Sequence, residues 1–275
     1  MKTAWIFPGG AARGVYTAGV IYALCEMAIP KPDIIIAASA SAPTILCYIT
    51  GQYEIIPQVW LESLSTRKFV NFWRFWKVLN INYLIDYVLK KKHPLDMVKV
   101  ANSDILIYFP LTDAQTGKIE YFSNKMSVDL WEIIRASISI PIVTNLFSVK
   151  GSQVNGKWFF DSAPAGHFQS HIGKAIQEGA EKIIVFNNWL AGDNPHPHIF
   201  PNLLAKVRSH IFRANQLRHM EEVAKFSPPV GIEFIKLEPK TNLGMGRFEI
   251  DNQIARTIFK RGYEDTFNDE VLNLL

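Results

Sequence analysis

The stretch IIIAASASAPTILCYI, residues 34–49, decides the fold of this chain. Residues 34–38 form an uncharged run that begins with three isoleucines, which indicates a buried strand, and residues 40–49 indicate a buried helix. Ser39 lies at the bend between them. A serine on a tight strand-to-helix turn presents its hydroxyl outside the backbone, with the helix N-terminus pointing at it. The sequence therefore predicts that Ser39 does chemistry, and an ordinary helix-capping serine is the alternative.

The elements expected around this stretch give the fold class. Residues 2–7 indicate a strand, and residues 15–25, apolar nearly all round, a buried helix. The first fifty residues therefore alternate strand and helix, which predicts an α/β fold with a mainly parallel sheet and helices on its faces. Strands at 143–149 and 154–160 are separated by residues 150–153, with another turn at Asn155-Gly156, and they suggest a hairpin whose second arm delivers Asp161. The other strands are expected at 105–111, 118–122, 182–186 and 230–237, and helices from Ser127 to before Pro141 and at 168–178, 203–225 and 251–266.

The composition of the chain limits the class of protein. With 275 residues, 48% of them hydrophobic, the chain can bury one large core, and we expect a single domain over residues 1–275. A formal net charge of +4 with 20% charged residues is only a mild basic excess, so we expect no nucleic-acid partner. Cys25 and Cys47 each lie in an apolar helical stretch and are expected to be reduced core residues.

The apolar segments do not have the pattern of a signal peptide or a membrane span. Residues 3–7 are followed at once by Pro8-Gly9-Gly10, which makes this run too short for a signal peptide. The long uncharged run 34–50 changes period and contains serines and a proline. We therefore expect a cytoplasmic or peripheral membrane protein.

Residues 69–92 interleave aromatic with cationic side chains and are expected to be helical. Packing of the aromatic side chains on the core is the preferred interpretation, and contact with a lipid–water interface is the alternative. The aromatic residues are Phe72, Trp73, Phe75, Trp76, Tyr83 and Tyr87, and the cations beside them are Lys68, Arg74 and Lys77.

Three turns rich in small residues follow expected strands: 9–14 (GGAARG), 37–41 (AASAS) and 161–164 (DSAP). Because sites in parallel sheets assemble at the carboxyl ends of strands, we expect these turns at one edge of the sheet. The first turn lacks the Gly-Lys-Ser/Thr ending of a phosphate loop and the glycine at position 11 that a dinucleotide site needs. An oxyanion hole at a helix N-terminus is the remaining functional interpretation, and a turn that only allows close packing is the alternative.

Asp161 is the acidic residue that strand-end placement puts closest to Ser39. A serine hydroxyl is a poor nucleophile until a base removes its proton, so Asp161 is the predicted base, with a turn or N-cap residue as the alternative. The loop 194–198 lacks the further ligands of a metal site. We favour a Ser–Asp dyad over a triad because none of the histidines after Asp161 lies in a recognisable catalytic sequence: His167, His171, His196, His198, His210 and His219.

These three turns, in this order, resemble the motifs of the patatin-like phospholipase family, which has a Gly-Gly-Gly-x-Arg/Lys-Gly loop, a Gly-x-Ser-x-Gly elbow and an Asp-Gly-Gly/Ala turn. Supporting matches extend the resemblance over nearly the whole chain: Thr112-Asp113 with Thr116-Gly117, residues 135–141 (RASISIP) and residues 261–265 (RGYED). On this resemblance Ser39 corresponds to the nucleophile and Asp161 to its partner. Gly9, Gly10 and Ala11 correspond to the oxyanion loop, and Arg13 to its basic, substrate-binding position.

The resemblance implies a three-layer α/β/α sandwich and a serine acyl hydrolase of the phospholipase A or lysophospholipase type. Such an enzyme works through an acyl-serine intermediate without metal or cofactor. Its partner is a phospholipid or another lipid ester, with peripheral membrane contact. Two alternatives stay open: a lipid-binding or regulatory protein that has lost turnover, and an acyltransferase that uses the same dyad.

Four positions depart from the family motifs. Ala11 in the loop, Ala37 and Ser41 in the elbow, and Ser162 after the aspartate stand where the family has glycine. A Cβ at a position that needs a positive φ or a close backbone approach costs about 1 kcal/mol or more. Because every replacement is Ala or Ser, we expect a site that is altered and still tight. Ser41 is the rival nucleophile, but the register of the preceding strand favours Ser39.

Overall fold

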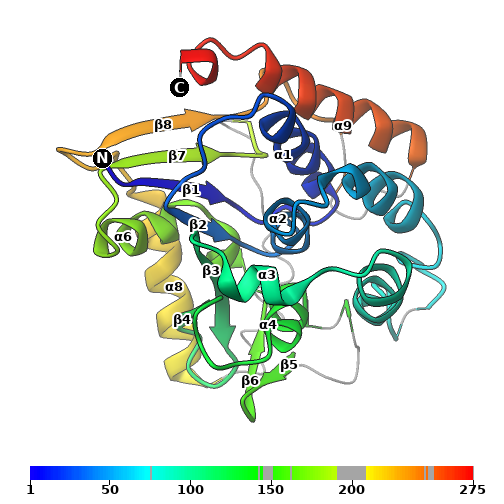
Figure 1. Cartoon of the computed structure of the whole chain (residues 1–275). Coiled ribbons are helices and arrows are strands. Elements are labelled where there is room, and N and C mark those ends of the chain that lie inside the picture. Colours follow the sequence, from blue (N-terminus) through cyan, green and yellow to red (C-terminus); the bar gives the residue numbers. More distant parts are fainter. Residues whose placement is uncertain are drawn as a thin grey trace.

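The structure, a computed structural model, describes residues 1–274 apart from 75, 142, 145–150, 162, 191–208, 245 and 247–250. The centre of the described part is an eight-stranded sheet in the order β5-β6-β3-β2-β1-β7-β8, in which β4 also pairs with β3 (Figure 1). The strands are β1 (Thr3–Phe7), β2 (Ile34–Ala37), β3 (Leu106–Asp113), β4 (Ile119–Ser123), β5 (Ser152–Val154), β6 (Lys157–Phe160), β7 (Lys182–Phe186) and β8 (Glu233–Leu237).

The sheet is parallel from β3 to β8, and its other end, formed by β4, β5 and β6, is antiparallel. β1 pairs in parallel with β2 and β7, and the parallel pairing continues to β3 on one side and β8 on the other. β4 and β6 both pair antiparallel with β3, and β5 pairs antiparallel with β6. The central strands are almost continuously apolar because parallel sheets are covered on both faces. The predicted α/β fold with a mainly parallel sheet is confirmed.

Helices surround this sheet. The α-helices are α1 (Gly14–Glu26), α2 (Ser41–Ile49), α3 (Met97–Asn102), α4 (Leu130–Ser137), α5 (Ala163–Gly166), α6 (Gln169–Gln177), α8 (His210–Ala224) and α9 (Asn252–Phe267). Short 3₁₀ turns are η1 (Ala11–Arg13), η2 (Tyr53–Ile55) and η5 (Leu272–Leu274), and two π-helical segments are η3 (Gln58–Leu64) and η4 (Tyr83–Lys92).

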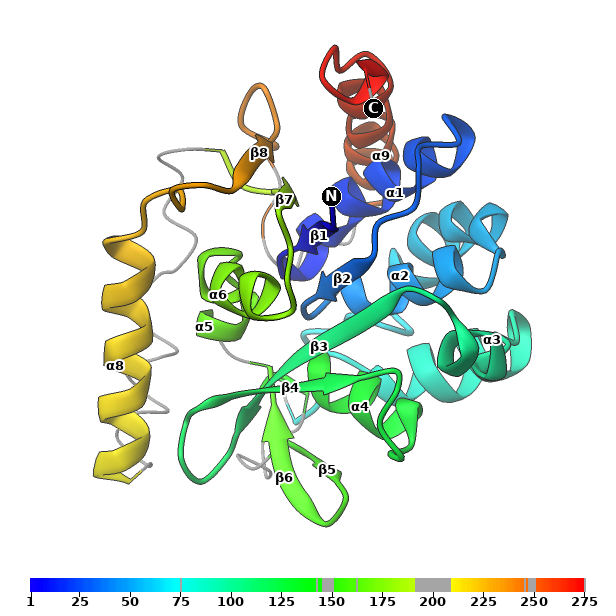
Figure 2. The same cartoon turned by 60° about the vertical axis from the view of Figure 1, so that its left-hand side comes forward.

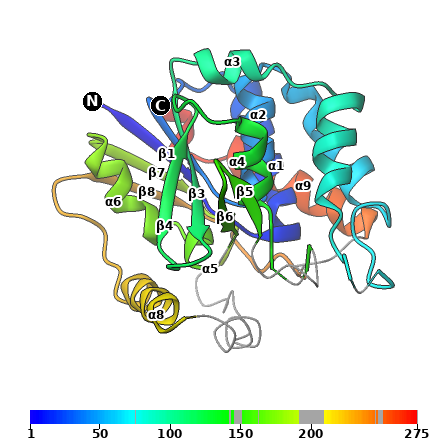
Figure 3. The same cartoon turned by 90° about the horizontal axis from the view of Figure 1, so that it is seen from below.

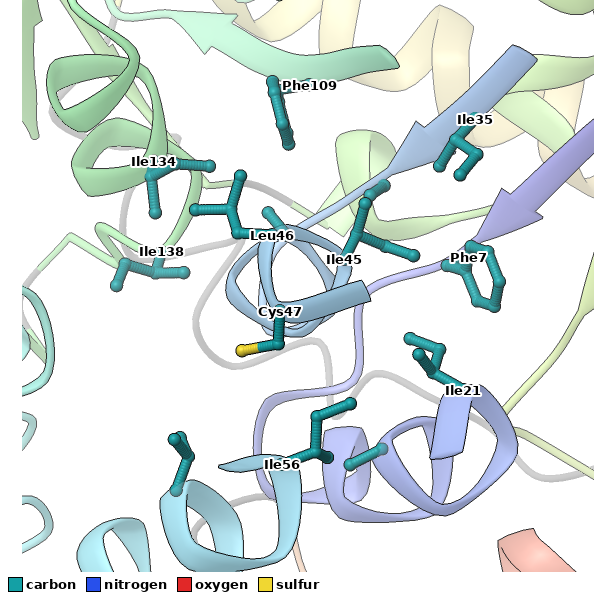
Figure 4. Packing of buried hydrophobic residues seen from close by; sticks show 14 of the residues in the cluster. Phe7, Ile21, Ile35, Ile45, Leu46, Cys47, Ile56, Phe109, Ile134 and Ile138 are labelled. Carbon is teal, nitrogen blue, oxygen red and sulfur yellow. The ribbon is translucent and has the colours of Figure 1, made fainter. Parts of the chain in front are cut away.

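Alternate residues of the strands point into two separate cores, which gives the three layers. Phe7 of β1, Ile35 of β2 and Phe186 of β7 pack against α1, α2, α4 and α9. Their neighbours Ile6 and Ile36 point the other way and pack against α6. Figure 4 shows α2 at the centre of the first core, where its side chains lie among residues from the strands, α1 and α4. On the other face α8 stands outside α6 (Figure 2).

The expected turns come together at one edge of the sheet, although the third arrives from the opposite direction. Phe7 and Ala37 are register partners, so the chain leaves β1 and β2 at the same level. β6 runs antiparallel to β3, with Phe160 opposite Thr112, and it carries the chain to Asp161. Asp161 thus reaches the expected edge at the end of an antiparallel hairpin arm, as predicted.

The hairpin before Asp161 has one of the two predicted turns between its arms. The turn predicted at Asn155-Gly156, which have φ angles of 47° and 78°, connects β5 to β6, whereas residues 152 and 153, expected in the other turn, belong to β5. Two consecutive residues with positive φ are typical of the tight turns that connect twisted antiparallel strands. Most of the first arm expected at 143–149 lies outside the described residues.

Two helix predictions also need correction. Helix α4 is capped by Asp129, whose carboxylate accepts a hydrogen bond from the N–H of Trp131, rather than by Ser127. Residues 69–92 are not one helix: residues 70 and 79 form an antiparallel bridge, and the π-helical segment begins only at Tyr83. The helix expected at 203–225 is found as α8, and residues 203–208 lie outside the described part.

Both cysteines are free, as predicted, with Cys47 fully buried and Cys25 half-buried. Burial raises the pKa of each thiol to about 12. Within the described residues, no helix combines the length and the apolar character needed to cross a membrane.

Candidate active site

Ser39 sits on a strained turn between β2 and α2. Its φ angle is +52°, in the left-handed region that residues with a Cβ seldom occupy. The N–H group of Ser39 donates to Ser137 Oγ at 3.1 Å, and that of Ala38 donates to the carbonyl of Phe7 at 3.0 Å. These two hydrogen bonds hold the turn against α4 and β1. The helix-capping alternative is wrong, because Ala40 is the N-cap of α2 and no side chain caps this helix.

The hydroxyl of Ser39 points at Asp161. Ser39 Oγ donates to Asp161 Oδ2 at 2.6 Å, a length typical of hydrogen bonds from a hydroxyl to a carboxylate. The N–H of Asp161 donates to the carbonyl of Ser139 at 2.9 Å. Ser39 is 6% exposed, and Asp161 is partly exposed. This geometry allows the carboxylate to take the hydroxyl proton directly.

The stretch 135–141, which the sequence offered only as a supporting match, supports both members of this pair. Ser137 Oγ accepts from the N–H of Ser39, and the Ser139 carbonyl accepts from that of Asp161. Arg135 lies at the other end of the stretch, where its guanidinium binds Asp86 at 2.8 Å. The stretch thus fixes the separation of Ser39 and Asp161.

The glycine-rich loop lies directly against Ser39. A Cβ on Gly9 would meet the Cβ of Ser39 at 2.8 Å, so only glycine fits there. The N–H of Gly9 donates to the carbonyl of Gly166 at 2.9 Å. Within the described residues, the N–H groups of Gly10 and Ala11 have no acceptor. Ala11 adopts the glycine-like conformation that its position requires, with φ +50°.

Ser41 has a structural contact that excludes it as the rival nucleophile. Its side chain is completely buried, and its hydroxyl donates to the carbonyl of Pro8 at 2.7 Å. Ser41 therefore ties the elbow to the start of the glycine-rich loop, from the position where the family motif has a glycine.

Residues after β7 complete the support of the loop, and the sequence did not identify them. The indole N–H of Trp189 donates to the carbonyl of Gly9 at 3.2 Å. The guanidinium of Arg13 stacks on the Trp189 ring, 3.9 Å from its centre. Asn188 is fully buried beneath Gly10, where a Cβ on the glycine would meet its amide nitrogen at 2.7 Å. The sequence does contain a signal for these residues, because polar side chains follow the buried strand 182–186 directly, at the same edge of the sheet.

His171 supports the turn after Asp161 from behind. Its imidazole is fully buried, with Nε2 2.9 Å from the carbonyl of Ala165 and Nδ1 3.0 Å from the hydroxyl of Tyr121. Burial lowers the pKa of His171 to about 4, so the ring is neutral near pH 7. A neutral imidazole carries one N–H, which we assign to Nε2 because a carbonyl can only accept. His196 and His198 lie outside the described residues.

An apolar pocket opens beside Ser39. The pocket is open to solvent, and Ser39 and Ser65 are the lining residues that carry hydroxyls. Such a pocket suits a hydrocarbon chain. The remaining lining residues are Ala11, Ala12, Val15, Ala40, Pro43, Val59, Trp60, Leu64, Phe69, Val70, Leu79, Ile81, Leu84, Ile138, Ile140 and Ala255.

The other two sequence matches have structural roles. Asp113 Oδ1 accepts hydrogen bonds from the N–H groups of Gln115 and Thr116 and so shapes the turn between β3 and β4. In the stretch 261–265, Gly262 brings α9 close to α1, and Asp265 accepts from the hydroxyl of Tyr16 at 3.0 Å. Among the described residues, no group of three or more His, Cys, Asp or Glu side chains is arranged to hold a metal ion.

The fold and the Ser39–Asp161 geometry define an α/β protein with the arrangement of a serine hydrolase. The family model described as patatin-like phospholipase matches residues 6–165, more than half of the chain and a range that includes both residues. The chain belongs to the patatin-like phospholipase family. This membership confirms the resemblance and indicates lipid acyl hydrolase activity on lipid substrates. A search of curated proteins finds no significant match.

Proposed function

We propose that the protein hydrolyses lipid esters through a dyad of Ser39 and Asp161. The observation that carries this proposal is the 2.6 Å hydrogen bond from Ser39 Oγ to the Asp161 carboxylate beside the apolar pocket. A carboxylate in this position removes the serine proton as the oxygen attacks, which makes an otherwise weak nucleophile reactive.

The reaction proceeds in two stages. Ser39 Oγ bonds to the ester carbonyl carbon while its proton passes to Asp161. The N–H groups of Gly10 and Ala11 stabilise the oxyanion, and the ester C–O bond breaks as Asp161 gives the proton to the departing alcohol. Water then attacks the acyl-serine, its proton passes to Asp161 and on to Ser39 Oγ, and the fatty acid leaves.

The substrate is a phospholipid or lysophospholipid, or another lipid ester, held by its acyl chain in the apolar pocket. The pocket begins at Ser39 and carries no charged side chain among its lining residues, so it favours hydrocarbon over a headgroup. Arg13, stacked on Trp189 at the loop, supplies a cation near the polar end of the substrate. Such substrates reside in membranes, and the protein therefore works in peripheral contact with a lipid surface.

We also propose that residues 1–275 form one acyl-hydrolase domain. β7 lies in the sheet between β1 and β8, although it falls beyond the matched range 6–165. Ala255 of α9 lines the same pocket as Ser39. Segments from both ends of the chain thus contribute to one core and one site.

A fluorophosphonate probe together with ester hydrolysis tests the proposed nucleophile. Ser39→Ala is expected to abolish labelling, and Ser39→Ala and Asp161→Asn to lower ester hydrolysis by about 10³-fold or more. Ser41→Ala is the matched control and is expected to remain labelled, because the Ser41 hydroxyl is buried and donates to the Pro8 carbonyl. If the folded wild-type protein neither reacts with the probe nor hydrolyses soluble esters, it would instead be a lipid-binding protein. Transfer of acyl groups to added alcohols in preference to water would indicate an acyltransferase.

A further inference from the structure

Residues 71–74 and 76–78, here named the aromatic tip, form a projection at the end of a short antiparallel pair. Residues 70 and 79 form the bridge, and the N–H of Asn71 donates to the carbonyl of Val78 at 2.9 Å. Inside the tip, the N–H of Trp73 donates to the Asn71 side chain at 2.9 Å. The tip lies in the cyan trace that protrudes at the lower right of Figure 3. It therefore has a defined conformation.

Large aromatic side chains in the aromatic tip face solvent. Trp73 is 86% exposed, Phe72 59% and Trp76 46%. The bridge residues Val70 and Leu79 are buried. The base of the tip is therefore packed against the protein, whereas its end exposes apolar side chains. Several exposed aromatics on one short turn are unusual for a surface that meets only water, and they mark an interaction site.

The charged residues of the aromatic tip and its base are all cationic. Residues 66–80 contain four cations, Arg67, Lys68, Arg74 and Lys77, and no acidic residue. Arg67 and Lys68 are exposed at the base. Arg74 folds back, and its guanidinium donates to the carbonyls of Arg67, Lys68 and Phe69, which stiffens the base. Aromatic rings flanked by cations suit the interface of an anionic bilayer, where rings lie at the headgroup level and cations meet lipid phosphates.

The base of the aromatic tip is also the wall of the pocket beside Ser39. Phe69, Val70 and Leu79 line that pocket. A lipid surface that met the exposed rings would lie close to the route by which an acyl chain enters. Continuity between the tip and the pocket favours a membrane over a protein partner, because a protein partner has no need of this route.

We propose that the aromatic tip docks the protein on membranes that contain anionic phospholipid, with Phe72 and Trp73 inserted among the headgroups and Arg67 and Lys68 on the lipid phosphates. This inference rests on the proposed lipid-ester substrate, since docking beside the pocket serves an enzyme that draws lipid from a bilayer. It replaces the preferred interpretation of the sequence, in which these aromatics pack on the core.

Co-sedimentation of the full chain with phosphatidylcholine vesicles, with and without phosphatidylglycerol, tests the docking surface. The wild-type protein is expected to bind the anionic vesicles. The double variant Phe72→Ser/Trp73→Ser is expected to lose about tenfold or more in binding, and Arg67→Glu/Lys68→Glu to lose the preference for anionic lipid. Val230→Ser changes another fully exposed apolar residue, in the turn before β8, and is expected to bind like the wild type. Thermal unfolding confirms that each variant is folded.

The catalytic variant separates docking from turnover. Ser39→Ala is expected to bind anionic vesicles like the wild type, so vesicle binding reports docking even where ester hydrolysis is absent. Docking is overturned if the wild-type protein does not bind vesicles, or if the tip variants bind as well as it does. It is equally overturned if Phe72→Ser/Trp73→Ser changes the oligomeric state in gel filtration and leaves vesicle binding intact, because the tip would then be a protein interface.

Discussion

Ala11 of the glycine-rich loop and Ser39 of the elbow both have left-handed backbone conformations, although each carries a Cβ. Each such conformation costs about 1–2 kcal/mol relative to the ordinary helical region. The surrounding hydrogen bonds hold the turns in place, notably the one from the Ser39 N–H to Ser137 and the one from Ser41 to the Pro8 carbonyl. Strain at these two positions keeps the hydroxyl out of the backbone and leaves loop N–H groups available.

The glycine-rich loop gives a prediction with a matched pair of adjacent variants. Gly9→Ala would place a Cβ 2.8 Å from the Ser39 Cβ, and we expect it to lower kcat/KM by about a hundredfold because the loop must move away from the hydroxyl. Ala11→Gly removes a Cβ at φ +50° and is expected to keep activity and to raise stability by about 0.5–1 kcal/mol. Ester kinetics and urea unfolding measure both effects. A Gly9→Ala enzyme with wild-type kinetics would contradict the placement of this loop.

At the level of single residues, the sequence predicted the site residues that a local motif identifies. Ser39 and Asp161 each follow a strand, and the structure brings them together at 2.6 Å. Trp189 was not identified, because it hydrogen-bonds to the backbone carbonyl of Gly9 from a distant part of the chain, and only its place just after a buried strand indicates it. Ser137 likewise binds a backbone N–H. A hydrogen bond to a backbone atom leaves no motif in the sequence of the partner.

Among the elements, the contact between α1 and α9 is set by glycines on both helices. A Cβ on Gly19 would meet the carbonyl oxygen of Phe259 at 2.0 Å, and one on Gly262 that of Tyr16 at 2.2 Å. Backbones that approach so closely exclude any side chain between them. The close approach explains the glycine in the stretch 261–265 as a packing requirement, and it places Ala255 of α9 at the pocket.

Two glycine-to-alanine changes in helix interiors are expected to act in opposite directions. Gly173 of α6 has open space where its Cβ would lie, so Gly173→Ala is expected to stabilise the protein by about 1 kcal/mol through helix propensity. Gly262→Ala gains the same propensity but forces α9 away from Tyr16, and we expect a net loss of about 1–3 kcal/mol. Chemical denaturation of the two variants beside the wild type measures both. Equal stabilisation by both changes would mean that the two helices are less tightly packed than described.

The prediction at the element level failed where a turn signal was absent. The aromatic tip reverses direction without a glycine or proline between residues 70 and 79, so its sequence was interpreted as helix. At Asn155-Gly156 the turn signal is strong, and the predicted turn is found between β5 and β6. The central strands and helices were predicted well because their apolar runs are long and bounded by glycine or proline.

For the whole molecule, the buried His171 couples stability to pH. Its pKa is lowered from 6.5 to about 4 by burial, whereas in the unfolded chain it titrates near the ordinary value. As the pH falls below 6.5 the unfolded chain takes up a proton that the folded protein does not, so folding becomes less favourable. The loss reaches about 3 kcal/mol near pH 4 and levels off at lower pH, where both states are protonated.

Urea unfolding at pH 7 and at pH 4.5 is expected to show this dependence. The wild-type protein should lose more stability between the two pH values than His171→Gln, because the glutamine cannot take up a proton in the unfolded state. The variant itself is less stable at pH 7, since it loses the imidazole contacts to Ala165 and Tyr121. The informative quantity is therefore how much more the free energy of unfolding changes with pH in the wild type than in the variant. Identical slopes would show that His171 does not titrate differently in the two states.

The position of β1 between β2 and β7 also affects how the protein folds during translation. Trp5 pairs with Ile35 on one side and with Ile184 on the other, so one side of β1 has its partner almost at once and the other only after most of the chain has been synthesised. During translation that second side is an open, apolar strand edge of the kind that recruits other strands. This edge stays open until β7 has been synthesised, and the glycine-rich loop gains the support of Trp189 only at that late point.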